Sequence, residues 1–257
     1  STNVSALAAG QTLGLNGVTS AANEAAWGAT VAAGNLAVSA SGGALEVSGT
    51  KLATLNISGT GTAGAAGLAI TEGTTTKVLS TVNADMSGAA YLNLSGLTKL
   101  TTVTSTGKGG LTVNANTAIK TITTGEGADR VTISLATSKD NEATVTDETL
   151  SAQVTTGGGA DTVKVNTSGT GTTTVVTGEG NDTVYFDGIG SGLNVIELGA
   201  GNDTIYRGAS SATTTVDGGA GTDTLVRGAT SYTAASYISD NAVYSNMEAL
   251  TFTGAVT

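Results

Sequence analysis

A short pattern, G-x-G-x-D-x followed by an aliphatic residue, occurs five times in the second half of the chain. The copies are TTGEGADRVTI, TTGGGADTVKV, TGEGNDTVYF, LGAGNDTIYR and DGGAGTDTLV. Their aspartates are Asp129, Asp161, Asp182, Asp203 and Asp223, separated by 32, 21, 21 and 20 residues. One copy would mean little in a chain with 38 glycines. Four copies in near-constant register indicate a structural repeat of about 20 residues.

Short bursts of alternating apolar residues recur along the whole chain, separated by Gly, Thr, Ser and Ala. The clearest are Leu45 with Val47, Leu55 with Ile57, Leu68 with Ile70, Leu92 with Leu94, Leu111 with Val113, and Val131 with Ile133. Such alternation predicts half-buried strands, and a regular repeat of strand and turn predicts a solenoid whose coils bury their apolar faces against each other. We therefore predict an all-β, right-handed parallel β-solenoid. A β-sandwich is the alternative, whereas a hydrophobic content of 39% argues against disorder.

Composition excludes several functions. The chain of 257 residues has no histidine and no cysteine, so it lacks the usual general base near neutral pH and any thiolate metal site. We predict that it is not an enzyme. A net charge of −10 repels nucleic acid and anionic lipid, and no apolar run approaches the roughly 18 residues of a membrane span. We expect no nucleic-acid partner and no membrane insertion. The segment 59–64, GTGTAG, fits a dinucleotide fingerprint, but no helical pattern follows it, so we interpret it as a chance match.

The repeated aspartates point to a cation. A coil of about 20 residues holds two strands and two turns, so the regular aspartates should stack along one edge about 4.8 Å apart. Unit charges about 5 Å apart repel by about 3 kcal/mol at an effective dielectric constant of 20. Calcium relieves this repulsion because it binds six to eight oxygens at about 2.3–2.6 Å, and magnesium fits less well. We predict several bound calcium ions, up to about four. The predicted metal-site residues are Gly125, Gly127, Asp129, Gly157, Gly159, Asp161, Gly178, Gly180, Asn181, Asp182, Gly199, Gly201, Asn202, Asp203, Gly219, Gly221 and Asp223.

Other residues near the repeats have two interpretations. Asp187, Glu197 and Asp217 either complete calcium shells or are surface charges. The acidic segment 138–148 is interpreted as a solvated insertion, with an extra ion site or a hydrolytic acid pair as alternatives. The interval of 32 residues before Asp161 leaves open whether Asp129 lies on the same edge as the other aspartates.

Side chains around the turns carry simpler expectations. Glu126 and Glu179 should face solvent, and Tyr185, Phe186 and Tyr206 should stack from coil to coil. The intervening turns 166–172, 187–194 and 207–213 lack the aspartate pattern, so we expect ions along one edge only. The threonine runs near residues 171–176 and 212–216 leave a flat ice-binding face as a further alternative.

The five turns resemble the glycine- and aspartate-rich nonapeptide repeats of RTX proteins, which bind calcium in a parallel β-roll. DGGAGTDTL matches the G-G-x-G-x-D-x-U-x pattern from Gly218 onward. The chain departs from that family because its period is about 20 residues rather than nine. The turn GGAGTDTLV and the later strand SNMEALTFTGA (245–255) are together similar to a module of bacterial surface-layer (S-layer) proteins exported by type I secretion.

This resemblance implies a calcium-binding structural segment of a secreted bacterial surface-layer protein. It implies self-association into a lattice, and a cell-surface polysaccharide anchor through parts outside this chain. The alternatives are a stalk of an RTX adhesin and an accessory domain of a secreted hydrolase or epimerase. We expect three segments, with 1–122 as a Thr/Ala/Gly-rich solenoid, 123–226 as the calcium-binding roll, and 227–257 as a cap that contains Tyr232, Tyr237 and Tyr244.

Overall fold

The computed structural model describes residues 3–18, 23–62, 64, 66–73, 77–136, 151–168, 171–188, 192–208, 213–228 and 242–253. These residues form strands joined by turns, and none of them is helical. No described segment is a helix long and apolar enough to cross a membrane. The chain divides into two compact units, residues 1–131 and 132–257.

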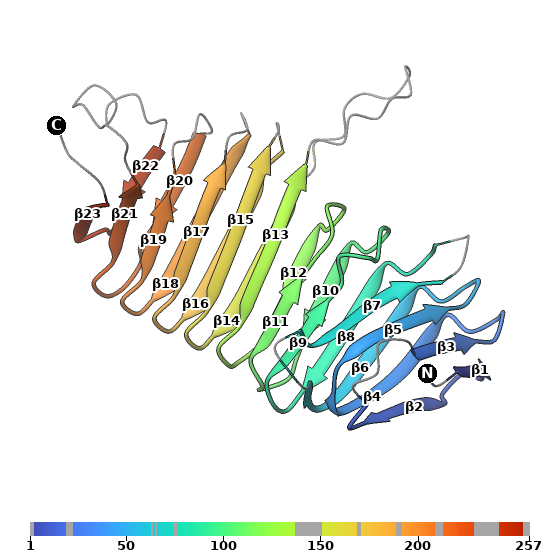
Figure 1. Ribbon diagram of the computed structural model, residues 1–257. Coiled ribbons are helices and arrows are strands. Elements are labelled where there is room, and N and C mark those ends of the chain that lie inside the picture. The colour runs from blue at the N-terminus through green and yellow to red at the C-terminus, as the bar shows by residue number, and fades with distance from the viewer. Residues whose placement is uncertain are drawn as a thin grey trace, which may run out of the picture. The chain divides into compact units, whose positions relative to one another are not determined.

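The first unit is a stack of coils with two strands in each. Its strands are β1 (Asn3–Leu7), β2 (Thr12–Asn16), β3 (Asn23–Trp27), β4 (Ala33–Ser41), β5 (Gly43–Ser48), β6 (Thr54–Thr62), β7 (Leu68–Glu72), β8 (Thr81–Met86), β9 (Ala90–Asn93), β10 (Thr102–Ser105), β11 (Leu111–Asn114) and β12 (Thr121–Thr123). Odd-numbered strands form one parallel sheet and even-numbered strands form the other (Figure 1). The segment GTGTAG begins within strand β6, and the next element in the described part of the chain is strand β7, not a helix.

Aliphatic side chains in register fill the space between these two sheets. Leu55 pairs with Val82, Val82 with Val103, and Val103 with Ile122, and all four are fully buried or nearly so. The residues between them in each strand face outward, as the period of two requires. The predicted alternation is therefore confirmed, including the six apolar pairs read from the sequence.

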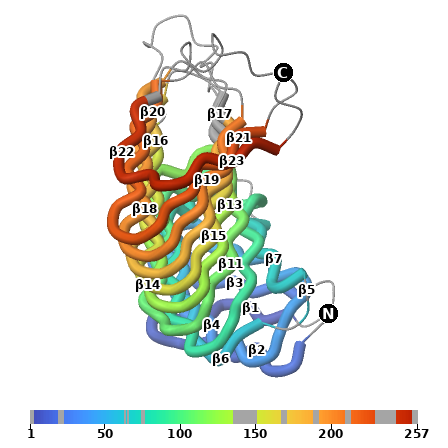
Figure 2. Tube along the Cα trace, turned by 90° about the vertical axis from the view of Figure 1, so that its left-hand side faces the viewer, coloured from blue at the N-terminus to red at the C-terminus, as the bar shows by residue number. Residues whose placement is uncertain are grey.

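The second unit repeats this architecture. Its strands are β13 (Arg130–Ala136), which begins at the boundary, then β14 (Ala152–Gly158), β15 (Thr162–Ser168), β16 (Thr173–Glu179), β17 (Thr183–Gly188), β18 (Leu193–Ala200), β19 (Thr204–Arg207), β20 (Thr213–Asp217), β21 (Thr224–Gly228), β22 (Ala242–Ser245) and β23 (Ala249–Thr253). Odd and even strands again form separate parallel sheets. Successive coils follow nearly the same outline when viewed from the side (Figure 2). The predicted all-β parallel solenoid, of about 10 turns, is confirmed.

In the second unit, paired residues of β15, β17, β19 and β21 lie 20 or 21 positions apart, which is the length of one coil. Val163 pairs with Val184, Val184 with Ile205, and Ile205 with Leu225, so a single aliphatic stack crosses the unit. Residues 242–253, assigned to a cap from the sequence, form β22 and β23 and continue both sheets by pairing with β20 and β21. The acidic segment 138–148, Tyr232 and Tyr237 lie outside the described residues.

Aromatic side chains behave in two ways. Tyr185 and Tyr206 occupy the outer face and stack with ring centroids 4.7 Å apart and an interplanar angle of 10°, as predicted. Phe186 instead points inward and is fully buried, in register with Arg207 of the next coil. Phe186 does not share the stack of Tyr185 and Tyr206, because neighbouring residues of a strand point to opposite faces.

Candidate metal centre

Each repeated aspartate lies directly before an odd-numbered strand. Asp129 precedes β13 just as Asp161 precedes β15, so the long interval does not change its place within the coil. Asp182, Asp203 and Asp223 precede β17, β19 and β21. The turns that carry the aspartates of the second unit stack in a row along one edge (Figure 1). The pattern predicted a common edge for Asp161, Asp182, Asp203 and Asp223, and it left the place of Asp129 open.

All five aspartates are buried, with exposed fractions of 2% or less. Oδ1 of Asp182 has a defined partner, because the backbone N–H of Asp161 donates to it over 2.8 Å. The N–H of Asp182 donates to Asp203 over 2.7 Å, and that of Asp203 to Asp223 over 2.8 Å. Asp129 in the first unit accepts from the N–H of Leu111 over 2.6 Å. These hydrogen bonds fasten the coils of Asp129, Asp182, Asp203 and Asp223 to the coils before them.

The second carboxylate oxygen is different. Oδ2 of Asp182, Asp203 and Asp223 is buried and has no hydrogen-bond partner among the described residues. A buried carboxylate oxygen without a partner is costly, so such a position calls for a cation or a proton. The chain's own residues therefore fit a hard cation that accepts one oxygen from each aspartate, with further oxygens from the glycine turns.

Burial controls the charge of these carboxylates. The pKa of Asp203 is raised to about 6, mainly by burial, against the lowering effect of the Asp182 N–H and with a smaller rise from the neighbouring charges of Asp182 and Asp223. Burial likewise raises the pKa of Asp182, opposed by the Asp161 N–H and the nearby Thr177 hydroxyl. The pKa of Asp223 is raised by burial and then by the charges of Glu248 and Asp217. Loss of hydration, more than mutual repulsion, is therefore what a bound cation has to offset.

The glycines bring the backbones of successive turns into contact. Gly180 and Gly201 have φ angles of 130° and 145°, which side chains rarely adopt. A Cβ atom on Gly180 would lie 1.7 Å from the carbonyl oxygen of Gly159, and one on Gly201 would lie 1.8 Å from that of Gly180. These carbonyl oxygens therefore project along the stack toward the next turn, at the level where a cation between coils would need them.

The two asparagines of the pattern lie on the exposed side of the turns. Oδ1 of Asn181 accepts a hydrogen bond from the N–H of Asn202 over 2.8 Å. Oδ1 of Asn202 accepts one from the N–H of Thr222 over 2.9 Å. Both amide oxygens thus bind the backbone of the following coil. Their contacts support a role in stacking the turns.

The remaining acidic residues separate into two groups. Glu126 and Glu179 are exposed, as expected, and Glu126 forms a surface ion pair of 3.3 Å with Lys108. Glu197 and Asp187 are also exposed. Asp217 lies beside the last glycine turn, where its Oδ1 accepts from the Gly219 N–H over 3.1 Å. Among the described residues no three acidic side chains gather into one cluster, because the coil supplies one aspartate per turn.

Sequence reasoning missed one member of the row. Glu248 lies directly before β23, and its Oε2 accepts a hydrogen bond from the Asp223 N–H over 2.7 Å. It thus occupies the position that an aspartate holds in the four preceding coils. The spacing Glu248-x-Leu250 repeats that of Asp223-x-Leu225, and this was the available signal.

The close approach of the turns gives a direct test. We expect Gly201→Ala to destabilise the second unit by at least about 2 kcal/mol, because the new Cβ meets a carbonyl oxygen at a strained φ. Gly158→Ala is the matched control, since a Cβ at Gly158 has no atom within 4 Å. Urea unfolding at saturating calcium measures both variants. Equal stability of the two would contradict the packing described here.

Comparison with known proteins agrees with this geometry. The chain matches the family model of the RTX calcium-binding nonapeptide repeat (4 copies) over residues 167–185, 190–211 and 215–230. Repeats of this kind bind calcium, and four copies suit several ions. The matched residues include Asp182, Asp203 and Asp223 but not Asp129 or Asp161. No curated protein and no solved structure matches the chain.

Proposed function

We propose that this chain is a non-enzymatic, calcium-dependent structural segment of a secreted bacterial surface-layer protein. The observation that carries the calcium part is the row of buried Oδ2 atoms of Asp182, Asp203 and Asp223 in turns that match calcium-binding repeats. The metal-site residues named from the sequence belong to this proposal. Gly178, Gly180, Gly199, Gly201, Gly219 and Gly221 would offer carbonyl oxygens, and the aspartates would offer charge.

Calcium binding would be coupled to folding. The partnerless carboxylate oxygens exist only when the coils are stacked, so an ion that binds them stabilises the folded state and not the unfolded one. In the cytoplasm calcium is scarce, and the chain would remain unfolded and competent for export. Outside the cell the ion would complete the solenoid.

The lattice part of the proposal is supported by the outer surface of the second unit. Tyr185 and Tyr206 are each 38% exposed, and Leu193 is 51% exposed. Exposed apolar groups of this kind suit contacts between copies of a self-assembling protein. The resemblance of residues 245–255 to a surface-layer module points the same way. A polysaccharide anchor would be supplied by parts outside this chain.

Electron microscopy of the parent protein tests the lattice. We expect ordered two-dimensional sheets with calcium and dispersed particles after chelation. Calcium-dependent particles that remain single or form fibres would favour the adhesin stalk over a surface layer. Hydrolase or epimerase activity of the isolated chain would contradict the non-enzymatic assignment.

A further inference from the structure

The last coil of the second unit, β22 and β23, differs from its predecessors in how it turns. Asp217 and Thr224 flank six residues of the glycine turn, whereas their register partners Ser245 and Ala249 flank only three. This short turn contains no glycine. It lies beyond the residues that match the calcium-binding repeats, which end at 230. Nothing in the repeat pattern therefore assigns it a ligand.

Glu248 nevertheless reproduces the contacts of an aspartate. The N–H groups of Glu248 and Ala249 donate to the carbonyl oxygen of Asp223 over 3.1 and 2.9 Å, as the N–H of Thr224 donates to Asp203 over 2.8 Å. Its carboxylate accepts from the Asp223 N–H, as the carboxylates of Asp182, Asp203 and Asp223 accept from the aspartate N–H of the coil before. A glutamate side chain is one methylene longer, which lets it reach this N–H from the shorter turn.

The carbonyl oxygen of Asn246 and Oδ2 of Asp223 both lie close to Gly218, between the last glycine turn and the short turn. Asn246 adopts a left-handed conformation with φ of 51°. A Cβ built on Gly218 would lie 1.9 Å from the carbonyl oxygen of Asn246 and 2.7 Å from Oδ2 of Asp223. That Oδ2 atom belongs to a fully buried side chain and has no hydrogen-bond partner among the described residues. The partnerless oxygen thus faces the short turn, not solvent.

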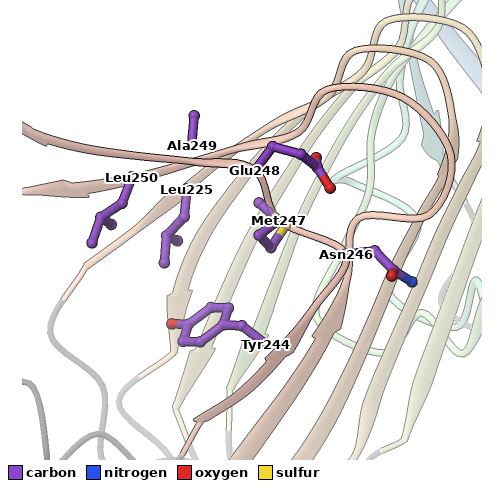
Figure 3. Close-up of a pocket in the computed structure, with 7 residues that line it drawn as sticks. All are labelled: Leu225, Tyr244, Asn246, Met247, Glu248, Ala249 and Leu250. Atoms are coloured by element: carbon purple, nitrogen blue, oxygen red, sulfur yellow. The ribbon is translucent and has the colours of Figure 1, made fainter.

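Polar and apolar side chains around the short turn point to different sides (Figure 3). A cavity of about 240 Å³ next to the short turn is lined by Leu225, Tyr244, Asn246, Met247, Glu248, Ala249 and Leu250. Figure 3 shows that Glu248 and Asn246 direct their polar ends away from Leu225 and Leu250, toward the side on which the chain turns. The Asn246 amide also donates to Oδ1 of Asp217 over 2.8 Å, which holds the turn in place.

We propose that Asp223, Glu248 and the carbonyl oxygen of Asn246 form a further calcium site between the last glycine turn and the short turn. This inference rests on the proposed calcium-binding function and extends it by one ion. The site fastens β22 and β23, which lie outside the repeats, to the row of turns. Without it the partnerless oxygen of Asp223 would face an unneutralised Glu248.

Native mass spectrometry counts the ions directly. We expect the Glu248→Gln variant to bind one calcium fewer than the wild-type chain, because the amide keeps the hydrogen bond to the Asp223 N–H but removes the charge. Glu197→Gln is the matched control, since Glu197 is an exposed acid of β18, and should bind as many ions as the wild type. Hydrogen exchange should also show faster exchange in β22 and β23 of Glu248→Gln alone.

Each outcome is decisive. An unchanged ion count and unchanged protection in Glu248→Gln would overturn this site and leave the calcium-binding function intact. A wild-type chain that binds no calcium would overturn both. If Glu248→Gln fails to fold, Glu248→Asp provides the second test: the shorter side chain should keep the ion count at high calcium but bind the last ion more weakly. Wild-type affinity for every ion in Glu248→Asp would contradict the site.

Discussion

Removal of calcium is expected to unfold the second unit between residues 151 and 228, while the first unit between residues 23 and 123 keeps its strands. A ligand at 100 times its dissociation constant stabilises the folded state by about 2.7 kcal/mol for each site. Three such sites contribute about 8 kcal/mol, which is comparable with the whole stability of a typical domain. The loss of these ions at neutral pH would leave Asp182, Asp203 and Asp223 charged and buried.

We expect no such dependence in residues 23–123 of the first unit, which lie before the Asp129 turn. Its interior is filled by large aliphatic side chains, among them Leu36, Leu45, Leu55, Leu68 and Leu92, all at most 1% exposed. The corresponding positions of the second unit carry mostly valine, for example Val163, Val165, Val175 and Val184. A leucine buries more apolar surface than a valine, so the first unit gains more from its own packing.

Hydrogen exchange with mass spectrometry, with and without a calcium chelator, separates the two units in one experiment. Peptides from residues 151–228 should exchange rapidly after chelation and regain protection when calcium, but not magnesium, is added back. Peptides from residues 23–123 should change little. Unchanged protection of residues 151–228 in the chelator would show that the aspartate turns stack without an ion.

The sequence revealed the row of aspartates because a constant interval fixes a constant place in the coil. Asp161 and Asp182 are 21 residues apart, and so are Asp182 and Asp203. This length allows two strands and two turns, and parallel pairing in register then brings the carboxylates to one edge. The burial of the alternate residues Val163 and Val165 follows from the same period. These features depend on local pattern alone.

Other features depend on contacts between coils, which a pattern does not encode. The N–H groups of Asp161, Asp182 and Asp203 each donate to Oδ1 of the next aspartate, so Oδ2 is the carboxylate oxygen that is left without a partner. Glu248 was overlooked because its turn has no glycine, and Asn246 supplies the left-handed conformation instead. Glu248 takes the place of an aspartate and Asn246 that of a glycine, and neither replacement can be recognised before the strands are placed in register.

Two buried arginines show the same limit. Arginine is rarely buried, yet Arg207 is 1% exposed and lies inside the coil. Arg227 pairs with it one coil later and is 3% exposed. Both donate to the hydroxyl oxygen of Tyr244, over 2.7 and 3.1 Å. A partner 37 residues along the chain from Arg207 made this inward position possible.

Acid is expected to restore part of the structure that calcium removal destroys. Burial raises the pKa of Asp182, Asp203 and Asp223 above the ordinary value of 3.8, and that of Asp203 reaches about 6. Folding therefore favours the protonated carboxyls. In the calcium-free chain the Asp203 share of this stabilisation is fully present below pH 3.8 and is lost as the pH rises through about 6.

With calcium the dependence has the opposite sign. The bound ion keeps the carboxylates ionised, so the stability of the calcium-bound chain should change little from neutral pH down to about pH 5. It should fall only as the pH approaches the ordinary carboxyl pKa of 3.8, where the unfolded chain takes up protons. The two stability curves should therefore approach each other in acid and separate at neutral pH. Thermal unfolding followed by circular dichroism, at about pH 4.5 and about pH 7.5, measures both curves. Calcium should be removed beforehand with a chelating resin, because protonation weakens soluble chelators.

The raised pKa of Asp203 sets the expected size of the pH effect on the stability of the calcium-free chain. A rise in the pKa of Asp203 from 3.8 to about 6 corresponds to at most about 3 kcal/mol between acid and neutral pH, reduced by solvent screening, and Asp182 and Asp223 act in the same direction. Asp203→Asn should remove the Asp203 share and flatten the calcium-free curve, because an amide does not titrate. Glu179→Gln should leave it unchanged, since Glu179 is exposed. A calcium-free chain that loses stability as the pH falls from 7 to 4 would show that these carboxylates are ionised and solvated, and that their burial does not drive calcium binding.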